Sequence, residues 1–315
     1  MELRNLGASG LRVSLVGLGC NNFGWRIEVE AARKVVHKAL DVGINLLDTA
    51  DMYGDGQSED MLGQILGPKR KDIVLATKFA GMFTGMSGGP FASRGYIMGA
   101  VEASLKRLKT DWIDHYQVHW PDPRTPMEET LHALDDLVRH GKVRYIGLSN
   151  HPAWKVADAQ WLARQSHLAP FVSCQDEYSL LVRGAERELI PAMRAFGLGL
   201  LPYFPLASGL LTGKYKKGAA LGADTRFASK QMGGLGNRYM TEENWPIVEK
   251  LEAYAAGKGH SILELALGWF AANPVVASVI AGATKPEQVE QNVGAMGWTL
   301  GADDLAAIDK ISAKA

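Results

Sequence analysis

The chain has 315 residues, of which 47% are hydrophobic and 22% charged, a composition that excludes a disordered or collagen-like protein. Its 34 Lys and Arg residues balance 34 Asp and Glu residues, and this zero net charge argues against a nucleic-acid binder or a membrane-surface protein. No apolar stretch reaches the roughly 18 residues that a membrane span needs. Cys20 and Cys174 are too few for a disulfide framework, so we expect free thiols in a reducing cytoplasm.

Short apolar runs alternate with amphipathic patterns along the chain. This alternation is typical of a parallel sheet covered by helices, and eight such units favour a closed (β/α)₈ TIM barrel, interpreted as a single domain over residues 1–315. A glycine-containing stretch before the first unit predicts a β-hairpin that caps the bottom of the barrel. The predicted strands are residues 13–18, 44–47, 73–77, 113–118, 145–148, 171–173, 199–203 and 277–281, the predicted helices include 28–42, 94–108, 127–140, 152–165 and 186–196, and the hairpin is 2–13.

Two predicted loops are unusually long. Residues 79–93 follow the third strand, and residues 207–244, which carry several Lys and Arg side chains, follow the seventh. Long ordered loops in compact domains are usually functional, and the loops after the strands of such a barrel surround its active site. Both loops are therefore expected at the functional end of the molecule.

Four polar side chains fall at the same ends of three neighbouring predicted strands. Asp48 ends the second strand and Tyr53 follows it, while Lys78 ends the third strand and His119 the fourth. The carboxyl ends of parallel barrel strands converge on one mouth. We therefore expect these four residues to form one catalytic site.

The chemistry that suits this set is proton donation to a carbonyl oxygen. A free tyrosine has a pKa of about 10, but an ammonium about 4 Å away would favour the phenolate by roughly 4 kcal/mol. That interaction alone would lower the pKa of Tyr53 by about 3 units before burial subtracts part of the effect. Asp48 would keep Lys78 charged, and His119 would orient the substrate oxygen.

Two other kinds of chemistry could use some of the same residues. Lys78 alone also permits a Schiff-base aldolase, although that leaves Asp48 and Tyr53 without a role. His115 and His119 lie on one predicted strand, about 13 Å apart, which is too far for two ligands of one ion, so no metal site is expected.

At this spacing on a barrel, Asp48, Tyr53, Lys78 and His119 resemble the catalytic tetrad of the aldo-keto reductase family. The runs 53–59, 148–150 and 206–215 extend the similarity, which covers essentially the whole chain. It is nearer to the bacterial branch with channel β-subunit-like and glyceraldehyde 3-phosphate reductase-like members than to the mammalian aldose reductases. The resemblance implies reversible hydride transfer between a nicotinamide cofactor and a small-molecule carbonyl/alcohol pair.

The resemblance also implies where the cofactor binds. A loop after the eighth strand would hold the adenosine 2′-phosphate, which favours NADPH over NADH. Gln288 stands where some branches have a basic residue, and Lys285 and Arg226 are expected to compensate. The implied cofactor-binding residues are Gly19, Asp48, Ser149, Asn150, Gln175, Tyr203, Leu206, Ser208, Gly209, Lys214, Arg226, Gly282, Thr284, Gln288, Gln291 and Asn292.

Aromatic residues in the loops after the strands predict an apolar wall for an uncharged aldehyde or ketone. The substrate-binding residues expected on this basis are Trp25, Tyr53, Phe79, His119 and Trp120. The alternative function is a catalytically weak, NADPH-binding regulatory subunit resembling channel β subunits. In that group an asparagine is expected where His119 stands, so the complete tetrad favours an enzyme. The sequence is compatible with a homo-oligomer.

Overall fold

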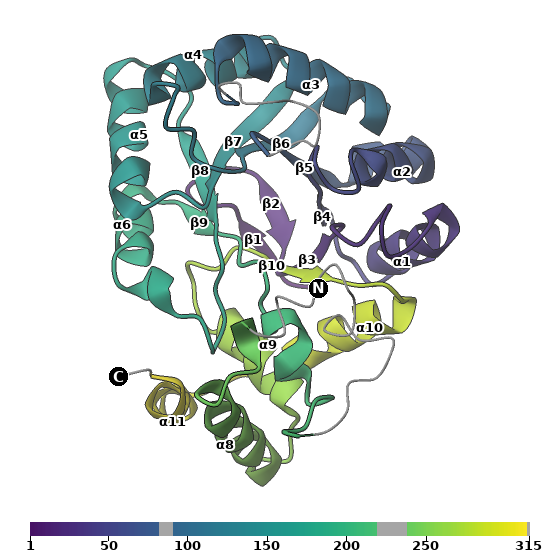
Figure 1. Ribbon diagram of the computed structural model, residues 1–315, viewed down its shortest axis with the longest axis vertical. Helices are drawn as coiled ribbons and strands as arrows, with labels where there is room; N and C mark the ends of the chain where they lie inside the picture. The colour runs from purple at the N-terminus through teal and green to yellow at the C-terminus, as the bar shows by residue number, and fades with distance from the viewer. Residues whose placement is uncertain (82–90, 219–237, 314–315) are drawn as a thin grey trace.

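A parallel eight-stranded sheet lies at the centre of the molecule in the computed structural model, which describes residues 1–81, 91–218 and 238–313 (Figure 1). Neighbouring strands follow the chain order, with β10 beside β3. Every hydrogen-bonded pair in this sheet is parallel. The strands are β3 (Val16–Gly19), β4 (Leu46–Asp48), β5 (Val74–Phe79), β6 (Ile113–Val118), β7 (Val143–Ser149), β8 (Phe171–Gln175), β9 (Gly199–Leu200) and β10 (Val279–Gly282).

The sheet closes on itself between β9 and the chain that enters β10. The backbone N–H of Leu200 donates to the carbonyl of Val275 at 2.7 Å, and the carbonyl of Leu200 accepts from the N–H of Ala277 at 2.9 Å. Further along, the N–H of Ile280 donates to the carbonyl of Pro202 at 3.0 Å. These bonds join the two ends of the sheet, and the predicted (β/α)₈ barrel is confirmed.

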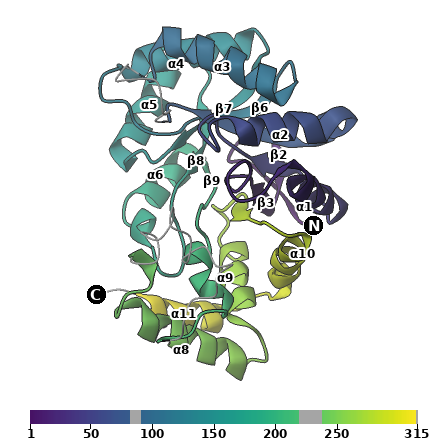
Figure 2. The ribbon, with the colours of Figure 1, turned by 45° about the vertical axis from the view of Figure 1, so that its right-hand side comes forward.

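Helices cover the outside of the sheet (Figures 1 and 2). The first helix shows why: its buried residues Ala32, Val35, Val36 and Ala39 follow the helical period and face the strands. The α-helices are α1 (Val29–Asp41), α2 (Gln57–Leu66), α3 (Arg94–Leu108), α4 (Met127–Arg139), α5 (Ala153–Gln165), α6 (Leu189–Phe196), α8 (Asn244–Gly257), α9 (Ile262–Ala271), α10 (Pro286–Gly294) and α11 (Ala302–Ser312). Short 3₁₀ segments are η1 (Gly67–Asp72), η2 (Gly184–Glu186), η3 (Ala207–Thr212) and η5 (Ala295–Gly297).

The observed strand boundaries lie within two residues of the sequence prediction except in two strands. The expected strand 13–18 is divided at Leu15, whose N–H donates to Glu2 in the hairpin while its carbonyl accepts from Val279 in the barrel. The seventh barrel strand is shorter than expected because Pro202 has no N–H to give to a ladder. In both places the backbone hydrogen-bond partners decide where the strand stops.

The predicted hairpin is confirmed and closes the N-terminal end of the barrel. Strands β1 (Leu3–Asn5) and β2 (Arg12–Ser14) pair antiparallel. Leu6, which lies between the two strands, and Val13, within β2, are fully buried. They pack in the same cluster as Leu46 and Val74 of the barrel strands. The bottom of the barrel is therefore an apolar plug rather than an opening.

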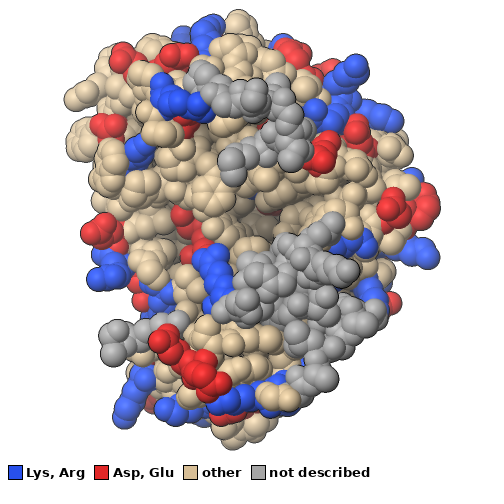
Figure 3. All heavy atoms as spheres, viewed as in Figure 1, with Lys and Arg blue, Asp and Glu red and all other residues tan. Residues whose placement is uncertain are grey.

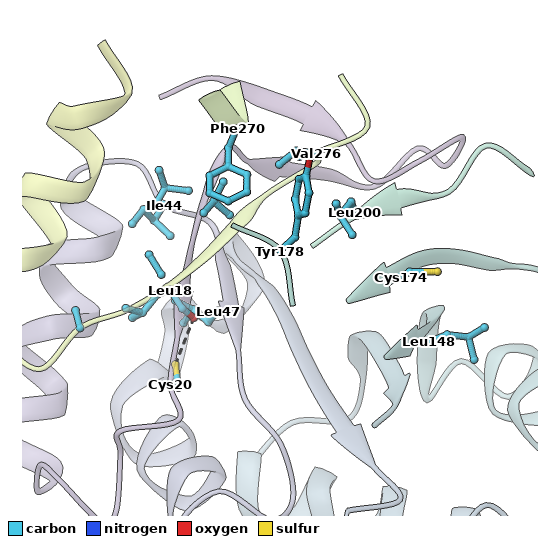
Figure 4. Close-up of a cluster of buried hydrophobic side chains, with 14 of the residues drawn as sticks. Leu18, Cys20, Ile44, Leu47, Leu148, Cys174, Tyr178, Leu200, Phe270 and Val276 are labelled. Atoms are coloured by element: carbon cyan, nitrogen blue, oxygen red, sulfur yellow. Dashed lines mark hydrogen bonds between the residues drawn. The ribbon is translucent and has the colours of Figure 1, made fainter. Parts of the chain in front are cut away.

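A larger apolar core lies between the sheet and the helices. Figure 4 shows part of it, with Leu18 and Leu47 from adjacent strands and Phe270 from α9 among the buried side chains. Cys20 and Cys174 are both buried free thiols. Within residues 1–81, 91–218 and 238–313, no helix combines the length and apolar character that crossing a membrane would need.

Gly7 in the hairpin permits the closest backbone approach at the barrel bottom. Its φ is +60°, and a Cβ there would lie 2.5 Å from the carbonyl oxygen of Gly197. Gly7→Ala is expected to lower the free energy of unfolding by about 2 kcal/mol or more, because the added methyl meets backbone that cannot move aside. Urea denaturation measures the change.

Gly99→Ala is the matched control, because Gly99 is an exposed position within α3, and a Cβ added there would meet nothing within 4 Å. It is expected to stabilise the protein by about 0.5–1 kcal/mol through helix propensity. An unfolding midpoint for Gly7→Ala equal to that of the wild type would contradict the packing described for the hairpin.

Candidate active site

A cavity of about 580 Å³ opens at the C-terminal ends of the barrel strands. Figure 3 shows the face of the molecule hollowed near its centre. Asp48 is the last residue of β4, Lys78 lies near the end of β5, and His119 comes directly after β6. Tyr53 follows β4 in the loop before α2, and Asp48, Tyr53 and His119 all line the cavity. The parallel register therefore brings the four expected residues to one mouth.

Lys78 is the centre of the polar contacts under this cavity. Its fully buried Nζ donates to Asp48 Oδ2 at 2.7 Å, to the Thr49 carbonyl at 2.9 Å and to the Tyr53 hydroxyl at 3.4 Å. Burial opposes the charge of the ammonium, but Asp48 and Tyr53 outweigh burial and raise the pKa of Lys78. The amine is therefore a cation at neutral pH.

The pKa of Tyr53 differs from the expectation drawn from the sequence. Burial raises this pKa, Lys78 lowers it, and the nearby charge of Asp48 raises it again, so that the net change is upward. The expected lowering is wrong for this structure because the loss of hydration and the Asp48 charge exceed the effect of the ammonium. At neutral pH the phenol keeps its proton, which is the state a proton donor needs.

His119 is a neutral imidazole beside the phenol. Burial and the Lys78 charge lower its pKa to about 3. Its ring lies edge-on to Tyr53, with 5.9 Å between the ring centroids and an interplanar angle of 84°, and stacks on Trp120 at 6.0 Å. Its Nδ1 is buried without a hydrogen-bond partner among the described residues. The imidazole can therefore hydrogen-bond a substrate oxygen but carries no charge of its own.

Asp48 is fixed by two further donors that come from two other strands of the barrel, β6 and β8. Its Oδ1 accepts from Gln117 Nε2 on β6 at 3.2 Å and from Gln175 Nε2 on β8 at 3.0 Å. Gln175 was expected as a cofactor residue. Gln117 was missed, although a glutamine within a predicted strand, two positions before His119, was a usable signal.

Almost every residue expected to bind the cofactor lines the cavity. Arg226 lies outside the described residues. The expected residues that line the cavity are Gly19, Asp48, Ser149, Asn150, Gln175, Tyr203, Leu206, Ser208, Gly209, Lys214, Gly282, Thr284, Gln288, Gln291 and Asn292.

Several of the residues expected to bind the cofactor are held in place by hydrogen bonds to one another. Asn150 has a φ of +61°, and its Nδ2 donates to the His119 carbonyl and to Ser149 Oγ, both at 3.0 Å. Its Oδ1 accepts from the Tyr203 hydroxyl at 2.7 Å, and Ser149 Oγ donates to the Gln175 carbonyl at 2.7 Å. This network fixes the amide of Asn150 beside His119.

The loop after β9 has the features of a phosphate site. Ser208 lines the cavity with a buried hydroxyl that has no hydrogen-bond partner among the described residues. Gly209 has a φ of +101°, and a Cβ there would lie 3.1 Å from Lys214 Nζ. Lys214 and two cations that sequence reasoning missed, Arg26 and Arg238, line the same cavity. These donors and charges fit the diphosphate of a nicotinamide dinucleotide.

Gln288 is used differently from the expected 2′-phosphate contact. Its Oε1 accepts from the N–H of Thr284 at 2.8 Å and from that of Lys285 at 3.3 Å, so it caps the start of α10. Lys285 is exposed and is not among the described cavity-lining residues, whereas Thr284 and Gln288 are.

The expected aromatic wall is only partly present. Trp120 is 48% exposed and lines the cavity. Phe79 is fully buried and packs on Tyr116 with 4.7 Å between ring centroids, because it follows the inward-facing Lys78 and so points outward toward the helices. Trp25 is half-buried, donates its indole N–H to the Asn21 carbonyl, and is also not among the described residues lining the cavity.

The family model "Aldo/keto reductase family" matches residues 15–313 of this chain. The chain is 39% identical to a probable voltage-gated potassium channel subunit beta of Oryza sativa, over 94% of this chain and 91% of the relative. It is 37% identical to the uncharacterized oxidoreductase YrpG of Bacillus subtilis, over 99% and 96% of the two chains. It is 34% identical to L-glyceraldehyde 3-phosphate reductase of Escherichia coli, over 98% and 92%.

Buried neutral histidines make the stability of the protein sensitive to acid. Burial lowers the pKa of His115 and His119 to about 3 and that of His151 to about 4. The unfolded chain binds these protons below about pH 6.5 while the folded chain does not, so each histidine lowers stability from about pH 6.5 toward pH 4. Asp51 and Asp176 act in the opposite direction over this range, because burial raises the pKa of both carboxyls to about 8. Each histidine contributes up to about 1.4 kcal/mol per pH unit.

Urea denaturation at several pH values between 7 and 5 checks this expectation. His119→Gln should make the fall in stability with acid less steep, while replacement of the exposed His132 by Gln should leave the wild-type slope. Because Asp51 and Asp176 oppose the histidines, the test is the difference in slope between the variants: equal slopes for the wild type and His119→Gln would show that this imidazole is not held neutral.

Proposed function

Because the chain belongs to the aldo/keto reductase family, we propose that it reduces an aldehyde or ketone to the alcohol with NADPH, at Asp48, Tyr53, Lys78 and His119. As a member of this family it is an NAD(P)H-dependent oxidoreductase that acts on small-molecule carbonyl compounds. The observation that carries the proposal is the position of the Tyr53 hydroxyl, which lies 3.4 Å from the buried ammonium of Lys78. Tyr53 lines the cavity together with His119.

Each residue of the site has a distinct task in this reaction. The reduced nicotinamide supplies a hydride when it is bound. His119 hydrogen-bonds the carbonyl oxygen, and Tyr53 transfers its proton to that oxygen as negative charge develops on it. Lys78 then stabilises the phenolate that Tyr53 becomes, which lowers the energy of the transition state more than that of the ground state. Solvent returns the proton to Tyr53 when the alcohol has left.

The raised pKa of Tyr53 agrees with this division of tasks. A phenol that is neutral before the reaction has a proton to give, and the ammonium acts only as charge appears on the oxygen. Asp48 keeps the lysine charged and directed at Tyr53 rather than at the substrate. Removing any one of these three groups would therefore affect the chemical step before it affects binding.

The preference for NADPH and for an uncharged substrate rests on which groups the cations of the cavity bind. The cations Arg26 and Lys214 line the cavity and are assigned to the phosphates of the cofactor, while Arg238 lines it in an ion pair with Glu177, so none of these three is left to bind an anionic substrate. Trp120, stacked beside His119, supplies an apolar surface for the carbonyl compound. The buried free thiols suit a reducing compartment, and we place the enzyme in the cytoplasm.

The relatives named as channel subunits favour a second candidate, a regulatory subunit that binds NADPH with little turnover. The complete set of Asp48, Tyr53, Lys78 and His119 favours the enzyme. Steady turnover of NADPH with any member of a panel of aldehydes and ketones supports the enzyme. Tight NADPH binding without turnover on the whole panel supports the subunit.

Tyr53→Phe removes the proton donor and leaves the ring in place. Turnover is expected to fall by at least about 100-fold, because general acid catalysis contributes on that scale. The dissociation constant for NADPH, measured by quenching of protein fluorescence, should change less than about twofold, since no phosphate contact is lost. Turnover that survives the change would remove Tyr53 from its assigned role.

Parallel kinetics with NADPH and NADH test the cofactor preference. We expect kcat/KM to be at least about tenfold higher with NADPH, which is the effect of one charge-assisted phosphate contact. The difference should appear mainly in KM, because the 2′-phosphate lies away from the reacting carbon. Equal values for the two cofactors would refute the preference but not the reaction.

A further inference from the structure

Gln117 is a buried polar residue in the barrel that the reaction described above does not use. It is fully buried, lies on β6, and is paired in register with Lys78 on β5. Residues paired across parallel strands point to the same side of the sheet, so Gln117 and Lys78 both point into the barrel. Its Nε2 donates to Asp48 Oδ1 at 3.2 Å, on the oxygen that Lys78 does not occupy.

The other half of the Gln117 amide has no hydrogen-bond partner in the part of the chain that the structure describes. Its Oε1 is buried and unpaired among the described residues. Leaving a buried acceptor unpaired is unfavourable, because the group loses its hydration and gains no partner in exchange. An apolar side chain of similar volume would avoid this cost, so the glutamine gains stability from its donor or serves the site. Among the described residues, the contact of that donor is with Asp48.

Asp48 needs this contact because it is the carboxylate that holds Lys78 in place. One of its oxygens holds Lys78, and the other would be an unpaired charge in a dry interior without the amides of Gln117 and Gln175. Gln175 lines the cavity, and its Nε2 would be exchanged or shared when a cofactor binds beside it. Gln117 is not among the described residues that line the cavity, so its bond is independent of ligand.

We propose that Gln117 is a positioning residue, which acts through Asp48 to keep the carboxylate oriented toward Lys78 and so sets the charge beside Tyr53. The proposal rests on the proposed function for its catalytic consequence, but the Gln117–Asp48 contact can be tested without turnover.

Most charged groups near this bond keep one charge state over the pH range of the measurement. Burial lowers the pKa of His115 to about 3 and raises that of Cys20, while the pKa of Lys78 is raised by its partners. None of these three changes charge between about pH 5 and pH 8. The titratable groups around the bond include Asp48 on β4, Tyr53 after β4, Lys78 on β5, His115 and His119 on and after β6, and Cys20 after β3. Asp51, in the loop after β4, titrates at the upper end of the range, because burial and the Glu59 charge raise its pKa to about 8, so each variant's profile is compared with that of the wild type.

Gln117→Glu turns the contact into a titratable one of the same shape. A protonated glutamic acid can donate its O–H to Asp48 as the amide does, whereas the ionised form places two carboxylates together. We expect kcat within about threefold of the wild type near pH 5 and at least about tenfold below it near pH 8, because adjacent carboxyl groups share a proton. KM for NADPH should change less than about twofold, because Gln117 holds no phosphate.

Gln117→Met removes the donor at every pH. Its kcat is expected to be about tenfold below the wild type across the whole range, the size of one lost hydrogen bond to a charged group, with no new pH dependence. Gln160→Glu is the matched control: Gln160 is a buried glutamine on α5 that binds the backbone of Phe171. It can lose stability as pH rises, but its kcat per folded molecule should follow the wild type.

A double-mutant cycle tests the contact without any assay of activity. The unfolding midpoints of Gln117→Met, Asp48→Asn and the double variant are compared by urea denaturation. If Gln117 acts through Asp48, the double variant should lose less than the sum of the two single losses. This result together with an inactive wild type would refute the proposed function and leave the Gln117–Asp48 contact standing.

Two results would overturn the proposal. One is additive effects in the cycle, which would mean that Gln117 only fills space. The other is a pH profile of kcat for Gln117→Glu that runs parallel to that of the wild type, or that Gln160→Glu reproduces. In either of these cases the effect of the new carboxyl group would not pass through Asp48.

Discussion

The buried ion pair between Lys78 and Asp48 is the interaction on which the site depends. Taking both charges out of water costs several kcal/mol for each ion, and such a pair persists only when every remaining donor and acceptor is satisfied. Here Lys78 donates to Asp48, Thr49 and Tyr53, while two glutamine amides complete the carboxylate. The partners come from four different strands or the loops after them, so only a closed barrel can assemble them.

The two ends of the barrel have different roles, because the N-terminal end contributes to stability and the C-terminal end carries the site. At the N-terminal end, Leu6 and Val13 of the hairpin complete an apolar plug that needs no polar partner. At the C-terminal end, polar side chains and strained backbone gather around the cavity, and both Asn150 and Ser208 have positive φ. Strain of this kind persists where the surrounding structure enforces it, and it is concentrated where a ligand is handled. The hairpin therefore supports the site without taking part in it.

The environment of Tyr53 shows why a pairwise argument about charge is incomplete. From Lys78 alone the pKa of the phenol should fall, but the same burial that strengthens the ion pair also removes water from the hydroxyl, and Asp48 cancels part of the lysine charge. The result is a phenol that holds its proton at rest beside a fixed positive charge. This arrangement stabilises the phenolate as the proton leaves, and so it stabilises the transition state more than the ground state.

The sequence alone determined the alternation of strands and helices, the barrel, and the placement of Asp48, Tyr53, Lys78 and His119 at one mouth, because a side chain at the end of a parallel strand has little freedom in where it lies. The tertiary structure decided what depends on contacts between distant segments. It placed Gln117 on Asp48 from β6, brought Arg26 and Arg238 to the cavity, and turned Phe79 toward the helices. These facts follow from strand register, loop paths and hydration, none of which is written in a local pattern of residues.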